Sequence, residues 1–531
     1  MADAAPAIEW DEAQFESVLE RLVSEGTIDA SGVRISAQQL ERLVEAAPRD
    51  PDCSARSLLK DANFEKATFT GAARFVGATF SGAARFGGAT FTGDAWFEGA
   101  TFTGDAWFGA ATFTGAAWFV GATFTGAASF EKATFTGAAW FGWAAFSGAA
   151  RFGGATFTGD AWFVGATFER ARALGPLIVW ERAAFTGAVF LEQVTLRISA
   201  ARVSLAGVVF RGGADLRVRW AQVELDDADF AAPSLVASLP PVTATESKSF
   251  LGWEELTDEG WRCRVADPPS GFEPRVVSMR RAKVGNLALS GVDLRACRFE
   301  GAHGLDQMRL EFVRFAETPS GWRWKPIPWR WTRRQVLAEE HQWRHPREGW
   351  YGEEIRGAGE ESEPLPPERI AAIYRALRKG REDNKDEPGA ADFYYGEMEM
   401  RRQKPQEVAA GSGDEREEPF SRSAGWGERL ILRLYWLVSG YGLRASRALI
   451  ALALTVVAFA FLFDWWGFSP DRHLGRALIF SIESTSSLFR LPETEGSALT
   501  PAGEVLQVVL RLLGPLFFAL ALLSVRGRVK R

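Results

Sequence analysis

Phenylalanine recurs along part of the chain at alternating steps of five and six residues. The series runs without a gap from Phe64 to Phe168, and an alanine lies two residues before nearly every member. A helix would turn about 190° over the average step, so successive phenylalanines would not share a face. On an extended backbone, residues two apart point the same way, so Ala and Phe face inward while the Thr or Trp between them faces out. The pattern predicts short strands that coil around a phenylalanine core.

The repeating unit is eleven residues long, close to Ala-Thr-Phe-Thr-Gly followed by Asp/Ala-Ala-Trp-Phe-x-Gly. The glycine that ends each half permits a tight corner. This A-x-F rhythm resembles the pentapeptide-repeat family, whose A-(D/N)-L/F-x-x units build a four-sided right-handed β-helix. The resemblance implies a right-handed β-solenoid. The chain departs from the family pattern by one extra residue in every second unit.

If four units make one coil, a coil has 22 residues, and residues 22 apart stack about 4.8 Å above each other. One outer face then carries Arg74 followed by a candidate interaction face of four tryptophans, Trp96, Trp118, Trp140 and Trp162. The opposite face carries Arg85, Trp107, Ser129 and Arg151, and the two remaining faces are mostly threonine ladders.

A stacked tryptophan column is a large apolar strip, and such strips usually mark a surface that contacts another molecule or another part of the chain. Three interpretations stay open. The column packs against this same chain or on itself, it forms a wall that binds a partner protein, or its rings stack on sugars or bases.

The whole chain is expected to be a multidomain α+β protein. Its predicted parts are a helical cap (1–60), a solenoid (61–235, regular over 61–170 and degenerate over 171–235, with wider spacing), a mixed segment with a second short repeat run (236–315), a Trp/Arg-rich helical region (316–403), a flexible linker (404–424), and an interfacial helix with two transmembrane helices (425–531). The alternatives are an independent docking module for the cap and an unrelated small β-domain for 171–235.

Apolar spacing refines three of these parts. In the cap, one apolar face contains Phe15, Leu19, Leu22 and Val23, and another contains Leu40, Leu43 and Val44. In the second repeat run, Leu289, Leu294 and Phe299 stand five apart, which predicts one or two further coils. Glu368–Arg378 and Asp392–Arg402 are expected to be the helices of a hairpin that docks on the solenoid or mediates assembly.

Two stretches are long and apolar enough to cross a membrane. Ala448–Phe468 would span about 31 Å as a helix, close to the thickness of a hydrocarbon core, and a second span runs from about Leu506 to Val525. Arginine and lysine lie before the first span and after the second, so both termini should be cytoplasmic, as should the solenoid. Gly427–Val438 is expected to lie along the membrane surface.

Between the spans lies a short apolar segment followed by serine and threonine. The order of span, short segment, loop and span resembles the two-span pore domain of potassium channels. Candidate pore-loop residues are Glu483, Thr485, Ser486, Ser487 and Arg490. The T-V-G-Y-G filter of that family is absent, so potassium selectivity is not supported. The alternative is an amphipathic loop that rests on the outer membrane surface.

Composition narrows the function classes. The net charge is −6, and the regular repeats carry six acids and five bases, too balanced for nucleic acid binding or DNA mimicry. Cys53, Cys263 and Cys297 have no disulfide or metal spacing, which suits a reducing cytoplasm. His341 and His345 would share a helix face, but no HExxH motif accompanies them, so no metal is expected. The scarcity of lysine beside arginine and alanine is typical of GC-rich bacteria.

No P-loop, nucleophile elbow or dinucleotide fingerprint occurs in the sequence. We therefore expect no enzymatic activity, no catalytic residues and no cofactor. The main hypothesis is a membrane-anchored scaffold in the cell membrane that binds an unidentified protein and contacts lipid. The alternative is an oligomeric, ion-channel-like protein, so self-association stays open.

Overall fold

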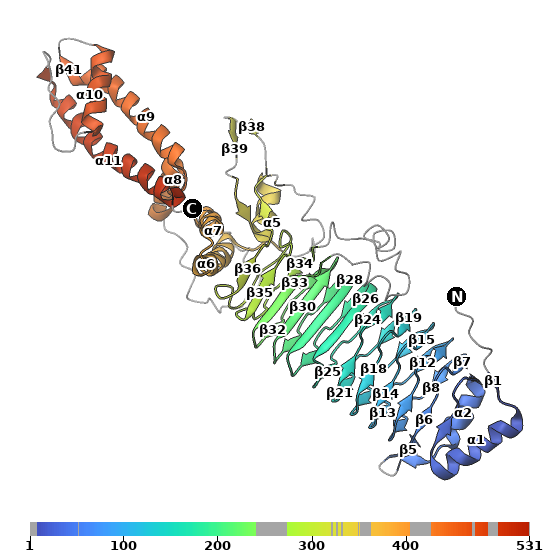
Figure 1. The fold of residues 1–531 in the computed structure, drawn as a ribbon. Helices are drawn as coiled ribbons and strands as arrows, with labels where there is room; N and C mark the ends of the chain where they lie inside the picture. The colour runs from blue at the N-terminus through green and yellow to red at the C-terminus, as the bar shows by residue number, and fades with distance from the viewer. Residues whose placement is uncertain are drawn as a thin grey trace, which may run out of the picture. The chain divides into compact units, whose positions relative to one another are not determined.

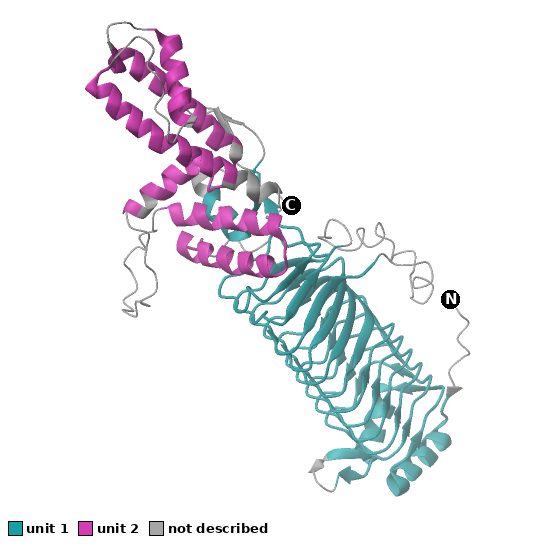
Figure 2. Ribbon diagram, turned by 60° about the vertical axis from the view of Figure 1, so that its left-hand side comes forward, with its two compact units in different colours: residues 1–363 teal, residues 364–531 magenta. Residues whose placement is uncertain are grey.

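In the computed structural model, the chain forms two compact units, residues 1–363 and 364–531 (Figure 2). The structure describes residues 8–50, 53–240, 273–319, 322–324, 328–330, 333–348, 350, 363–403, 426–469, 473–486 and 498–529. The predicted linker 404–424 therefore lies outside the described residues.

The first unit is a β-solenoid of short parallel strands (Figure 1). Four two-residue strands make one coil, for example β11 (Thr90–Phe91), β12 (Ala95–Trp96), β13 (Thr101–Phe102) and β14 (Ala106–Trp107). Each strand pairs in parallel with the strand 22 residues later, as in Thr90↔Thr112 and Trp96↔Trp118. The phenylalanines from Phe64 to Phe168 are at most 1% exposed. The predicted coil length, inward phenylalanines and four faces are confirmed.

The five-residue half of each unit turns at a corner with one residue in the left-handed backbone region. Every eleventh residue there has a positive φ, from Lys66 at 56° to Gly165 at 66°. The corner is a four-residue turn, in which the Ala100 amide donates to the Phe97 carbonyl at 3.1 Å. Glycine costs nothing in this conformation, but Ala110, Lys132 and Trp143 also adopt it. Because Gly99, for example, lies in the five-residue step from Phe97 to Phe102, the extra residue belongs to the other half of the unit, at the Thr-Gly corner.

The glycines of the Thr-Gly pairs from Gly93 to Gly137 are required for a different reason, the close approach of neighbouring coils. A Cβ on Gly126 would lie 2.4 Å from the Gly104 carbonyl oxygen, and a Cβ on Gly104 would lie 2.2 Å from the Gly82 oxygen. No side chain fits at these corners without moving the backbone.

After Phe168 the ladder continues as predicted, but the prediction of wider spacing is wrong. The stack of Phe190, Phe210 and Phe230 has an offset of 20 residues. The strands lengthen, in β26 (Ala173–Ala184), β28 (Val194–Ser204) and β30 (Ala214–Arg219). Because β26 pairs with both β23 (Thr156–Phe157) and β24 (Ala161–Trp162), each at an offset of 22 residues, it runs extended past the Thr-Gly corner at Gly159. The coil shortens at the next turn, where two register shifts between β26 and β28, at Leu174/Leu177 and at Val179/Arg182, reduce the offset from 22 to 20 residues.

Beyond residue 240 the ladder resumes at residue 275. The strands β34 (Arg275–Ser278) and β35 (Leu287–Ser290) pair with β31 (Gln222–Glu224) and β33 (Ser234–Ser238), and β36 (Arg309–Glu311) pairs with β35. Leu289, Leu294 and Phe299 are buried, so the predicted second repeat run is confirmed.

Ion pairs connect the coil before residue 240 with the coil that begins at residue 275. We call this connection the joint. Three pairs share one offset of 54 residues: Asp226–Arg280 at 2.8 Å, Asp227–Arg281 at 2.6 Å and Asp229–Lys283 at 2.6 Å. The regular coils have an offset of 22 residues and the coils from Phe190 to Phe230 an offset of 20, whereas across this joint an inserted segment raises the offset to 54.

At the N-terminus the ladder begins inside the segment expected to be only a helical cap. The helices are α1 (Glu12–Glu25) and α2 (Ala37–Ala46), and β2 (Ile28–Asp29) and β3 (Val33–Ser36) pair with β6 (Ala62–Asn63) and β7 (Thr68–Thr70). Phe15, Leu22, Leu40 and Leu43 are buried. Val23 is 58% exposed, so its predicted place on the apolar face is wrong.

The region predicted as helical from residue 316 begins with strands. One antiparallel pair joins β37 (Ala316–Glu317) to β40 (Gln335–Val336), and another joins β38 (Trp322–Trp324) to β39 (Pro328–Arg330). The helix α5 (Ala338–Glu348) follows. Alternation of Trp with Arg is a two-residue period, which fits strands rather than a helix.

The second unit is helical. Its elements are α6 (Pro367–Asp383), α7 (Glu387–Arg402), α8 (Trp426–Ser439), α9 (Ala445–Leu462), the π-helical turn η3 (Phe463–Gly467), β41 (Phe468–Ser469), α10 (Leu474–Ser486), β42 (Ala498–Leu499) and α11 (Pro501–Val529). In the predicted hairpin, α6 and α7 pack closely, since a Cβ on Gly396 would lie 2.6 Å from the Tyr374 ring. The two candidate membrane spans are Ser446–Gly467 and Pro501–Leu522.

Candidate functional site

The four tryptophans of the predicted interaction face form one column. Neighbouring ring centroids are 5.2, 5.2 and 5.1 Å apart from Trp96 to Trp162, with planes within 9° of parallel. The register of β12, β16 (Ala117–Trp118), β20 (Ala139–Trp140) and β24 imposes this stacking. We call these four residues the Trp column.

The ring faces inside the Trp column contact one another, which leaves ring edges for a partner. The guanidinium of Arg182 lies 5.6 Å from the Trp162 centroid at one end of the column, and Arg74 pairs in register with Trp96 at the other. All four tryptophans are partly exposed. Self-stacking, the first interpretation of the sequence pattern, is therefore present, and stacking of a sugar or base between the rings would require the column to separate.

The candidate pore-loop residues predicted from the sequence lie largely on α10, which packs between the two candidate spans. Ala477 and Phe480 join Ala460, Phe463 and Leu510 in one buried cluster. A Cβ on Gly514 of α11 would lie 2.6 Å from the Thr485 side chain. Ser481 and Ser484 are also buried, and their hydroxyls have no hydrogen-bond partner among the described residues.

The candidate pore-loop residues are therefore divided. Glu483 is exposed on α10, Thr485 is partly buried and donates to the Ser481 carbonyl at 2.7 Å, and the backbone of Ser486 ends the helix. Ser487 and Arg490 lie outside the described residues. What the structure brings together is the buried serine face of α10, which sequence reasoning did not select.

A family model described as pentapeptide repeats (9 copies) matches residues 64–112 and 108–152. These residues are pentapeptide repeats. The match covers the regular coils that carry three of the four tryptophans. Comparisons of the chain with curated proteins and with solved structures give no match.

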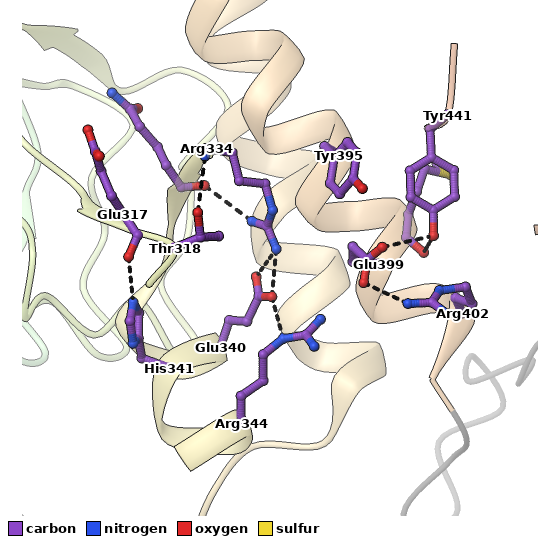
Figure 3. Close-up of polar contacts among 12 residues, drawn as sticks. Glu317, Thr318, Arg334, Glu340, His341, Arg344, Tyr395, Glu399, Arg402 and Tyr441 are labelled. Atoms are coloured by element: carbon purple, nitrogen blue, oxygen red, sulfur yellow. Dashed lines mark hydrogen bonds and ion pairs between the residues drawn. The ribbon is translucent and has the colours of Figure 1, made fainter. Parts of the chain in front are cut away.

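Beyond the matched repeats, the end of the pentapeptide-repeat solenoid holds a buried ionic cluster (Figure 3). Glu340, fully buried, accepts from the Arg334 Nη2 at 2.6 Å and from the Arg344 Nε at 2.7 Å. Buried charges persist only when paired and hydrogen-bonded, as here. The Arg344 guanidinium also lies 5.0 Å from the Trp350 centroid.

The neighbouring Glu339 caps the solenoid. Its carboxylate accepts the backbone N–H of Phe299, a core residue of the second repeat run. Burial raises the pKa of Glu339 to about 7, although that hydrogen bond opposes the rise. His341 is buried, and its Nε2 lies 3.2 Å from the Glu317 carbonyl oxygen, while His345 is exposed. Burial lowers the pKa of His341.

No group of three or more metal-ligating side chains occurs within the described ranges. Of the two histidines expected to share a face of this helix, His341 is buried and His345 is exposed. The signal for the ionic cluster in the sequence was the Glu339-Glu340 pair beside several arginines, but their partners could not be assigned without the fold.

A third cluster, also missed, lies in the second unit (Figure 3). Tyr395, Met398, Leu432 and Tyr441 form a buried cluster that joins α7, α8 and the turn before α9. Burial, and then the charge of Glu399, raises the pKa of the Tyr441 phenol well above its usual range. The sequence signal was a tyrosine between two glycines, Gly440-Tyr441-Gly442.

Proposed function

We propose that this protein is a membrane-anchored scaffold, with a pentapeptide-repeat solenoid on the cytoplasmic side that binds another protein. It acts without catalysis, and its membrane partner is lipid. Both termini lie in the cytoplasm of this multi-pass cell-membrane protein.

The observation that carries the proposal is the exposure of the two candidate spans. In their most apolar 18-residue windows, only 17% and 22% of the residues are buried. A core helix of a soluble protein would be covered by its own fold, whereas these helices present leucine, valine and phenylalanine outward. A bilayer supplies the missing apolar surroundings.

The orientation rests on charge. Arg433, Arg444 and Arg447 precede or open the first span, and Arg526, Arg528 and Lys530 follow the second. Basic residues beside spans favour the cytoplasmic side. An even number of spans then places both ends there.

Membrane extraction and topology mapping test the anchoring. The full chain should stay in the membrane pellet after alkaline carbonate treatment. Tags at both termini should be protected from protease that is added outside intact cells. Release by carbonate would contradict the proposal.

Crosslinking tests the scaffold role. A photoreactive residue at Trp140 should capture a defined protein in cells, whereas the same residue at Arg151, on the opposite solenoid face, should not. Equal capture from both faces would remove the Trp column as the binding surface.

A second function is favoured by α10, a short helix packed between two spans with one buried face that carries Ser481 and Ser484. This arrangement would suit an oligomeric, channel-like protein with a pore segment that lacks the potassium filter. Planar-bilayer recording of the purified chain decides this point. No conductance over a range of voltage and salt, or a monomer in native-like membranes, would exclude it.

A further inference from the structure

The helix α8 has two unlike faces. Leu430, Ile431, Leu434 and Leu437 recur at helical spacing and are between 42% and 66% exposed. Leu432 lies on the other side and is 8% exposed. One face of α8 is therefore covered by protein, and the other presents four large apolar side chains.

The covered face packs against α7 of the hairpin. The Trp436 Nε1 donates to the Tyr395 hydroxyl at 3.1 Å. The Arg402 guanidinium lies 4.8 Å from the Trp436 centroid and pairs with Glu399 at 2.9 Å. These contacts involve three aromatic or charged side chains of α7, so the hairpin is held along α8 rather than at one point.

Tyr441 joins both helices to the start of α9. Gly440, Tyr441 and Gly442 have consecutive positive φ values of 54°, 60° and 74°, a conformation that costs free energy for a tyrosine. The Tyr441 hydroxyl donates to Glu399 at 3.3 Å, and its ring lies 5.1 Å from Tyr395 and 5.9 Å from Tyr435. We call Tyr441, Tyr395, Glu399, Arg402 and Trp436 the latch.

Two observations identify what covers the apolar face of α8. Only Gly440–Arg444 separate α8 from α9, whose candidate span begins at Ser446, so α8 lies beside the level at which that span would enter the bilayer. Arg433 is exposed on α8, and Arg447 at the start of α9 lies 5.3 Å from the Trp436 centroid. Apolar residues flanked by arginine are the composition of a helix that lies in the headgroup region.

We propose that α8 is inserted in one leaflet of the membrane through Leu430, Ile431, Leu434 and Leu437, and that the latch fixes the α6–α7 hairpin against that membrane surface. The occupant of the apolar face is lipid, not a second protein. This inference rests on the proposed membrane anchoring. It assigns the hairpin to the membrane surface, a role different from docking on the solenoid.

Photocrosslinking in nanodiscs of the full chain identifies the occupant. p-Benzoylphenylalanine replaces Leu434 in one variant and Leu437 in a second, so that one misfolded variant does not decide the result. Leu454, 65% exposed on α9, is the control for a residue in the bilayer, and Glu382 on α6 is the control for an aqueous position. Mass spectrometry should find lipid adducts at positions 434, 437 and 454, and none at 382.

Two results would overturn the inference, and they are distinguishable. Lipid adducts at 454 combined with protein adducts or no adducts at 434 and 437 would leave the anchoring intact and remove α8 from the leaflet. The absence of lipid adducts at 454 as well would remove the anchoring itself.

The latch is tested separately with Tyr441→Ala. Lipid adducts at Leu434 should persist, while hydrogen exchange at the amides of residues 395–400 should accelerate at least tenfold. Tyr441→Phe keeps the ring contacts and should accelerate exchange less. Unchanged exchange in Tyr441→Ala would show that the hairpin is held by other contacts.

Discussion

The regular coils and the later coils of the solenoid both stack in a parallel ladder, but they differ in coil length and in core composition. From Phe64 to Phe168, similar eleven-residue units stack phenylalanine on phenylalanine at 4.6 to 5.1 Å, with an offset of 22 residues. From Phe190 to Phe230 the offset is 20, aliphatic side chains replace many of the core phenylalanines, and ion pairs such as Asp226–Arg280 hold the joint. A parallel ladder therefore constrains register strictly but leaves coil length and core composition free to change together.

The largest expected difference between the two regions concerns core truncation. Phe119 lies 4.8 Å from Phe97 and 4.9 Å from Phe141 in one stack, so Phe119→Ala should reduce local stability by about 3–5 kcal/mol. Leu216→Ala, at a fully buried site in the later coils, should cost about 2–3 kcal/mol because aliphatic neighbours repack more easily. Hydrogen exchange of the surrounding amides measures both. Equal losses would mean that the phenylalanine stacks give no additional stability.

The next effect concerns the close corners of the regular coils. Gly126→Ala places a Cβ 2.4 Å from the Gly104 oxygen and should destabilise the neighbouring coils by about 2–3 kcal/mol. Gly121→Ala is a useful control, because its Cβ meets nothing but its φ of 64° is strained, which should cost about 1 kcal/mol. Similar losses at both sites would show that coil separation adjusts freely.

The stability of the two regions should also differ in its dependence on pH. Because burial raises the folded-state pKa of Glu339 to about 7, the folded protein binds more protons than the unfolded chain between about pH 4.5 and 7. Stability of the later coils should therefore fall by about 3 kcal/mol as pH rises through this window. Glu339→Gln should flatten this dependence, as followed by hydrogen exchange near Phe299. The regular coils serve as the internal control, and a parallel slope there would refute the assignment.

The smallest effect concerns the left-handed corners. Ala110 occupies a corner position with φ of 55°, where most equivalent positions hold glycine. Ala110→Gly should increase local stability by about 1 kcal/mol by relieving that strain. Urea-dependent hydrogen exchange would detect it. A loss of stability would instead show that the added freedom of the unfolded chain outweighs the relieved strain.

The regular coils could be predicted in detail because their information is local. Each Phe and Ala repeats at a fixed spacing, and a strand has a two-residue period, so coil length, core and faces follow from the sequence alone. The Trp column was predicted by the same arithmetic. Its self-stacking could only be seen once the ring planes of Trp96 and Trp118 were placed.

The later coils and the candidate sites were harder because their partners are distant in sequence. Asp226 and Arg280 are 54 positions apart, with an intervening segment of unrelated composition. Tyr441 meets Glu399 across 42 positions, and Phe299 meets Glu339 across 40. No periodicity marks such pairs. The shortening to 20 residues also followed from two register shifts between β26 and β28, which no repeat in the sequence marks.

The joint between residues 240 and 275 has a consequence for how this chain can change over time. The coil after the joint pairs in register with the coil before it. The number of residues between the two coils therefore does not affect the geometry of the ladder. Sequence can be lengthened, shortened or exchanged at this position while every stacked coil keeps its neighbours. At this position, new segments that recognise other molecules can therefore be inserted while the stacked coils of the solenoid stay unchanged.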